Sequence, residues 1–129
     1  MNGIGAMIQE EVLAKEFITI VNHSFPKAAE AIRHCYVKVI TAPLKQMGKT
    51  VRYIGIYCSN DRLEAVKQQK NQLREVAIYM GLLEVVCLNA TRLVRDPASH
   101  LKQSDPRFWL ELQWVATEHA DPPFSSEEL

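Results

Sequence analysis

The fold is decided by residues 50–89, which read TVRYIGIYCS (50–59), NDRLEAVKQQKNQLREVAIYMG (60–81) and LLEVVCLN (82–89). The first and last segments are rich in β-branched and aromatic residues and are apolar on both sides, which is typical of strands covered on both faces. The middle segment predicts one long helix, about 62–80, because its apolar residues recur at helical spacing.

Both ends of this predicted helix carry recognisable signals. Asp61 followed by Glu64 resembles a capping box at its start, and Gly81 stands where a left-handed cap ends a helix. A helix of this length can return the chain so that the two strands lie parallel, which predicts a βαβ-like unit. Antiparallel strands with the helix packed on one face are the alternative.

The N-terminal part of the chain predicts a helical region. Residues 7–21 have a broad apolar face at helical spacing, and residues 1–6 are expected to be a flexible lead-in. A second helix is expected after Ser24, which can cap it, with Pro26 in the first turn.

Two segments allow more than one interpretation. Residues 36–41 (YVKVIT) are branched and alternating, which favours a strand paired with the strand at 51–58, although they could also continue the preceding helix. Residues 107–117 (RFWLELQWVAT) alternate as a strand would, and their aromatic content favours that interpretation. A helix that begins with Asp105 as cap and Pro106 in its first turn is the alternative.

These predictions add up to an α+β fold. We expect a small mixed sheet of about four strands with one long helix (about 62–80) packed on it in a βαβ-like unit, plus an N-terminal helical region. Residues 1–117 are expected to form a single domain. The acidic tail at 118–129 is expected to be disordered, because it lacks a core-forming pattern.

Composition indicates the class of protein and its compartment. The chain has 129 residues, of which 47% are hydrophobic, and it shows neither an apolar run of membrane-spanning length nor a signal-peptide pattern. Its three cysteines, Cys35, Cys58 and Cys87, are odd in number, widely spaced and each in an apolar segment, which favours a reduced, buried core role over any redox or metal role. We therefore expect a cytoplasmic protein that needs no membrane and no cofactor.

Charge is distributed unevenly along the chain although 15 basic and 15 acidic residues cancel overall. Residues 31–74 hold nine basic against two acidic side chains, whereas the first thirty residues carry −2 and the last twelve carry −4. A basic ridge is predicted to bind nucleic acid or another anionic partner, and its members are Lys45, Lys49, Lys67, Lys70 and Arg74.

Three further features carry functional hypotheses. The strand-to-helix turn at Ser59, Asn60 and Asp61 lies where α/β proteins bind ligands, although it lacks the glycines of a phosphate-binding loop. Trp109 and Trp114 are expected at an interface, either of a homodimer or with another protein. The histidines and cysteines show no metal-ligand spacing, so no metal site and no catalytic residue are assigned.

The leading functional hypothesis is therefore a non-enzymatic interaction or assembly subunit, acting in a nucleic-acid-processing complex through the basic ridge. One alternative is an enzyme or small-ligand-binding domain that uses the turn at Ser59 to Asp61. Another is a direct, non-specific nucleic-acid binder.

Overall fold

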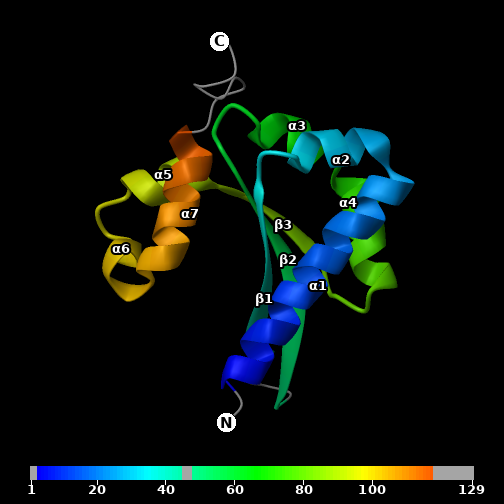
Figure 1. Ribbon diagram of the computed structural model, residues 1–129, viewed down its shortest axis with the longest axis horizontal. Coiled ribbons are helices and arrows are strands. Elements are labelled where there is room, and N and C mark those ends of the chain that lie inside the picture. Colours follow the sequence, from blue (N-terminus) through cyan, green and yellow to red (C-terminus); the bar gives the residue numbers. More distant parts are fainter. Residues whose placement is uncertain (1–2, 45–47, 118–129) are drawn as a thin grey trace.

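The computed structural model describes residues 3–44 and 48–117, and the side chains within them from residue 9 onward (Figure 1). Helices and strands follow one another in the order α1 (Gly3–Ser24), α2 (Pro26–Ile32), β1 (Tyr36–Leu44), β2 (Lys49–Cys58), α3 (Leu63–Gln68), α4 (Lys70–Tyr79), β3 (Val85–Asn89), α5 (Ala90–Arg95), α6 (Leu101–Ser104) and α7 (Pro106–Thr117).

The three strands form one mixed sheet in the order β1-β2-β3. β1 and β2 are an antiparallel pair, with Tyr36 opposite Tyr57, and this confirms the predicted strand at 36–41. β2 and β3 are parallel, with Ile54 opposite Val85. The parallel unit predicted from residues 50–89 is therefore confirmed, within an α+β fold whose sheet has three strands in the described residues.

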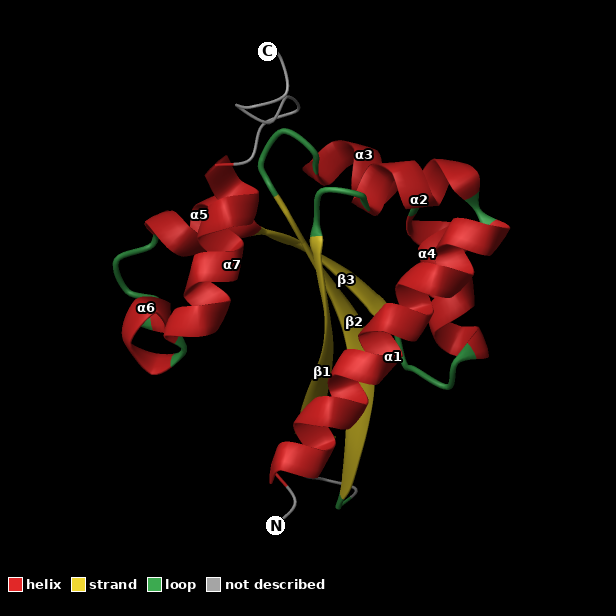
Figure 2. Cartoon of the chain, in the orientation of Figure 1, coloured by secondary structure: helices red, strands yellow, loops and turns green. Residues whose placement is uncertain are grey.

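Helices cover both faces of this sheet (Figure 2). α1 to α4 lie on one face and α5 to α7 on the other, which gives three layers. The division follows from side-chain alternation along the strands, because successive residues point to opposite faces. Ile54, Ile56 and Cys58 pack into one core cluster, whereas Tyr57 belongs to another.

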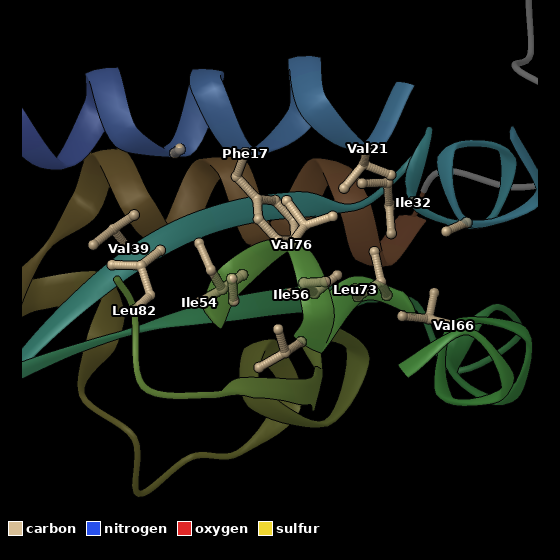
Figure 3. Packing of buried hydrophobic residues seen from close by; sticks show 14 of the residues in the cluster. Phe17, Val21, Ile32, Val39, Ile54, Ile56, Val66, Leu73, Val76 and Leu82 are labelled. Carbon is tan, nitrogen blue, oxygen red and sulfur yellow. The ribbon is translucent and has the colours of Figure 1, made fainter. Parts of the chain in front are cut away.

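The larger core lies under α1 to α4 (Figure 3). Phe17 and Val21 project from α1, Leu73 projects from α4, and both helices meet the strand residues Ile54 and Ile56. All five side chains are almost completely removed from water. Burial of this kind stabilises the fold by about 25 cal/mol per Å² of apolar surface, which makes this layer the main source of stability.

The smaller core contains an aromatic cluster. The rings of Tyr57 and Phe108 meet edge to face, with centroids 5.1 Å apart. Gly55 leaves room beside them, since a Cβ atom at that position would lie 2.7 Å from Cδ1 of Ile40. Burial of the phenol, reinforced by Tyr53 and Tyr36, raises the pKa of Tyr57 to about 12.

The predicted long helix is two helices. α3 ends at Gln68 and α4 begins at Lys70, with Gln69 between them in a non-helical conformation. The predicted capping box is also wrong, because α3 begins at Leu63 and its N-cap residue makes no side-chain cap hydrogen bond. Asp61 instead lies in the turn before the helix and is exposed.

The predicted fourth strand is also wrong, because residues 107–117 belong to helix α7. The alternative signals prevail: Pro106 begins the helix, and the Asp105 carboxylate accepts a hydrogen bond from the Phe108 N–H at 3.2 Å. Leu112 and Val115 are buried against the sheet. Apolar residues spaced for a helix are here also spaced for a strand, which explains the error.

Two smaller predictions about the N-terminal region are wrong. α1 begins at Gly3 and ends at Ser24, so residues 3–6 are helical, and Phe25 rather than Ser24 precedes α2. The predicted tail at 118–129 lies outside the described residues. Within residues 3–44 and 48–117, no helix has both the length and the hydropathy needed to cross a bilayer.

Candidate ligand-binding site

The carboxyl ends of β2 and β3 meet at one edge of the sheet. Cys58 and Asn89 are parallel partners and are the last residues of the two strands. The chain therefore leaves the sheet twice at this edge, once into the turn at residues 59–62 and once into α5. In α/β sheets, ligands bind at the edge where the carboxyl ends of parallel strands lie side by side.

Side-chain hydrogen bonds fasten these two exits to each other. The Asn60 backbone N–H donates to Oγ1 of Thr91, and the Asn89 amide nitrogen donates to Oδ1 of Asn60, both at 3.0 Å. The Asn89 side-chain oxygen caps α5, because it accepts a hydrogen bond from the Arg92 N–H at 3.0 Å. The position of the turn relative to α5 is thus set by three directed contacts.

A polar pocket of about 720 Å³ opens between these two segments. Its volume lies within the usual range for small-molecule sites. We call it the strand-end pocket, and its lining residues are Ser59, Asn60, Asp61, Asn89, Thr91, Arg92, Arg95, Asp96 and Ala116. Ala116 comes from α7, so the helix layer made of α5 to α7 forms one wall.

Ser59 is the buried polar residue of this pocket. It is 5% exposed, and within the described part of the chain its hydroxyl has no hydrogen-bond partner. A buried hydroxyl without a partner costs about 1–3 kcal/mol relative to one that is satisfied. A ligand or a water molecule in the pocket would supply the missing hydrogen bond.

Charged groups of both signs surround the pocket. Arg92 and Arg95 are exposed and three residues apart on α5, so both guanidinium groups lie on one side of the helix. Asp61 and Asp96 bring two carboxylates. One oxygen of Asp96 already accepts the Ala98 N–H at 2.9 Å, so the Asp61 carboxylate is the freer acceptor.

Among the residues that the structure brings into this site, the turn Ser59–Asn60–Asp61 was predicted from the sequence and the α5 side was not. Asn89, Thr91, Arg92 and Arg95 follow a predicted strand, so the same strand-end reasoning applied to β3 would have found them.

The described members of the predicted basic ridge have different positions and partners. Lys49 begins β2, and the Lys67 side chain lies near Cys58 at the opposite end of that ten-residue strand, about 30 Å along it. Nε of Arg74 lies 2.9 Å from Oε1 of Glu84, so its charge is paired. Lys70 lies near Cys87 on the same side as Lys67. Lys45 lies outside the described residues.

The two tryptophans occupy different environments on α7. Trp109 is half-buried, and Nζ of Lys102 lies 5.1 Å from the centroid of its ring. Trp114 is 56% exposed and Leu110, one turn earlier, is 62% exposed. These two residues form an apolar stripe on the outer face of the helix, whereas Trp109 is not part of that stripe.

Metal binding finds no support in the described side chains, which do not gather three His, Cys, Asp or Glu residues in a suitable arrangement. Comparisons with protein-family models, with curated proteins and with solved structures find no match to this chain, so its function has to be inferred from the strand-end pocket and the surfaces around it.

Proposed function

We propose that this protein binds a small anion that also carries hydroxyl groups, such as a phosphate ester or a hydroxy acid, in the strand-end pocket. One observation supports this above the others: the buried Ser59 hydroxyl lines an open pocket and lacks a hydrogen-bond partner among the described residues. Buried polar groups are nearly always hydrogen-bonded, so this hydroxyl is available to bind a ligand in the pocket.

The hydrogen-bonding groups left over in the pocket favour an anion. Once the contacts between Asn60, Thr91 and Asn89 are made, the remaining groups are mostly donors: the hydroxyls of Ser59 and Thr91, the Asn60 amide nitrogen and the two guanidinium groups. Guanidinium groups bind phosphate and carboxylate oxygens in pairs. The Asp61 carboxylate remains to accept hydroxyl groups of the ligand.

Binding without catalysis is the better proposal for this pocket. Its described lining contains no histidine, lysine or cysteine beside Ser59. A serine hydroxyl is a weak nucleophile unless a neighbouring base activates it. The pocket therefore favours recognition of an anion over nucleophilic catalysis by Ser59.

Titration with glycerol phosphate, inorganic phosphate and glycerol, followed by backbone amide chemical shifts, tests the proposal. Glycerol phosphate should shift the amides of 59–61 and 89–96 and bind more tightly than either half-ligand. The double variant Arg92→Gln/Arg95→Gln should lose phosphate binding by about tenfold or more, because each charge-assisted contact is worth about 1.5–3 kcal/mol. Lys49→Gln, at the far end of β2, is the control and should bind as wild type.

Two results would refute the proposal. One is the absence of shifts at 59–61 and 89–96 with any of the three probes. The other is an equal loss of affinity in Lys49→Gln and in the arginine double variant, which would indicate general charge attraction rather than a site.

A protein contact on α7 is the second candidate function, and the exposed pair Leu110 and Trp114 supports it. Exposed aromatic and aliphatic residues one turn apart are typical of interface centres. We propose that a second copy of this chain binds there. Sedimentation over a range of concentrations should show a dimer that Leu110→Gln/Trp114→Gln abolishes, while Tyr79→Gln, at an aromatic residue 80% exposed on α4, preserves it. A monomer at every concentration would refute the contact.

A further inference from the structure

The three cysteines lie on one face of the sheet, near the end where β1 begins and β2 and β3 stop. Cys58 ends β2, Cys87 lies in β3 beside Ile56, and Cys35 directly precedes β1. The antiparallel ladder ends with Tyr36 opposite Tyr57, and Cys35 and Cys58 are the next residues on these two segments. Cys35, Cys58 and Cys87 all point to the face that α1 to α4 cover, where they join the larger core.

Cys35 and Cys58 are placed for a disulfide, and Cys87 is not in register with either. Directly opposed residues of an antiparallel pair have Cα atoms about 4.5–5.5 Å apart, and Cys35 and Cys58 directly follow such a pair, Tyr36 and Tyr57, which places them near the range that disulfides require. The Cys35 N–H donates to the Ile32 carbonyl at 3.0 Å, so the ladder ends before this pair.

The two thiols differ in their access to solvent. Cys58 is completely buried. Cys35 is half-buried and lines a surface hollow of about 660 Å³ together with Glu30 and Arg33. A small reagent in solution therefore reaches Cys35 first, and Cys58 lies behind it on the core side.

The electrostatic environments of Cys35 and Cys58 also differ, and they favour the thiolate form at Cys35. A hydrogen bond from the Cys58 thiol lowers the pKa of Cys35, and the nearby Arg62 charge lowers it further, while burial acts in the opposite direction. The same hydrogen bond, with burial, raises the pKa of Cys58. Burial also raises the pKa of Cys87. Thiolate character therefore concentrates on Cys35 rather than on the half-buried Cys87 or the buried Cys58.

The hydrogen bonds of the reduced form do not hold the two sulfurs apart. Sγ of Cys35 lies 3.7 Å from the Ala31 carbonyl oxygen, and Sγ of Cys58 lies 3.6 Å from the Ile56 carbonyl oxygen. Both are long, weak contacts for a thiol donor. When Cys35 ionises, the Cys58 S–H can turn from its carbonyl to the thiolate.

We propose that Cys35 is a hydroperoxide-reactive thiol and that Cys58 is its resolving partner. The Cys35 thiolate attacks a peroxide oxygen, the O–O bond breaks, and the leaving oxygen takes a proton to depart as water or an alcohol. Cys35 is then a sulfenic acid. The Cys58 sulfur attacks the Cys35 sulfur, the S–O bond breaks, and water leaves with the Cys58 proton. Two thiols lose two electrons and the peroxide gains them.

This inference does not depend on the strand-end pocket. It does affect its neighbourhood, because the disulfide would link the beginning of β1 to the residue that precedes Ser59. The closed loop would contain the whole β1–β2 hairpin.

The test is oxidation of the intact folded protein with hydrogen peroxide, followed by mass spectrometry. Wild type should lose the mass of two hydrogens and yield one cross-linked peptide pair joining Cys35 to Cys58. Cys87→Ser, the matched control, should give the same product. Cys35→Ser should form no cross-link. Cys58→Ser should leave the sulfenic acid on Cys35, where dimedone traps it.

A second measurement serves if a serine variant does not fold, as judged by circular dichroism. In folded wild type, iodoacetamide should alkylate Cys35 faster than Cys87, since the pKa of Cys35 is lowered and that of Cys87 is raised. Urea should remove this difference. A cross-link through Cys87, oxidation of Cys87 before Cys35, or equal alkylation of the two in the folded protein would overturn the proposal.

Discussion

Truncation of two leucines on α7 should have very different effects on stability. Leu112 is completely buried in the smaller core, whereas Leu110, two residues earlier, is 62% exposed. Leu112→Ala and Leu110→Ala remove the same atoms from the same helix. On a strand the two residues would share a face, so similar losses would be expected.

The expected loss for Leu112→Ala is about 2–3 kcal/mol. Buried leucine truncations cost about 2–5 kcal/mol, with smaller values where neighbours can relax into the cavity. Relaxation is available here, because Phe108 and Leu101 beside the cluster are themselves only partly buried. At concentrations where the chain is monomeric, Leu110→Ala should change stability by about 0.5 kcal/mol or less, as surface substitutions usually do.

Urea unfolding followed by circular dichroism measures both losses, with equal slopes required for the comparison. A domain of this size should lose about 4 °C in Tm for each kcal/mol, so Leu112→Ala should melt about 8–12 °C lower and Leu110→Ala within about 2 °C of wild type. Equal losses in the two variants would refute the placement of α7 on the sheet.

Three further predictions concern single groups. The pKa of Tyr57 rises from 10.0 to about 12 on folding. The stability that the protonated phenol contributes to the folded state is therefore complete below pH 10 and is lost as the pH approaches 12. Across that window wild type should lose about 2–3 kcal/mol more than Tyr57→Phe in urea titrations, and matching pH profiles would contradict this. Gly81 has φ +83° with open space around it, so Gly81→Ala should cost about 1–2 kcal/mol from backbone strain alone; an unchanged Tm would rule that strain out. Asn89→Ala should cost about 1–2 kcal/mol by removing the α5 cap, and Asn89→Asp, which keeps the acceptor, should recover part of that loss in the same urea assay; no recovery would count against the cap.

The central unit of the fold could be predicted because its strands are unusually apolar. β2 and β3 are covered on both faces, so their sequences lack the alternation of a half-exposed strand and indicate a parallel pair. The break at Gln69 could not be predicted, since neither glycine nor proline marks it. Residues 107–117 satisfied both periodicities, and only the contacts with the sheet decide between them.

Only the turn side of the candidate site was predicted from the sequence. The turn at Ser59 to Asp61 and the residues after β3 each follow a strand that the sequence identifies, but only the parallel pairing of β2 with β3 shows that the two segments meet. The basic ridge shows what a count of charges along the sequence leaves out. A charge count along the chain ignores the pairing of Arg74 with Glu84, and it cannot register that Lys49 lies at the far end of a strand from Lys67.

The two helix layers come from separate, contiguous stretches of the chain, and this has a consequence for synthesis. All helices on one face lie within residues 3–79, whereas those on the other lie within residues 90–117. Every strand and the entire first layer therefore leave the ribosome before the second layer does. Until α5 to α7 dock, Tyr36, Tyr57 and Leu88 face water on a sheet that is already complete. During that interval the nascent chain presents a bare aromatic surface, the kind on which chaperones act.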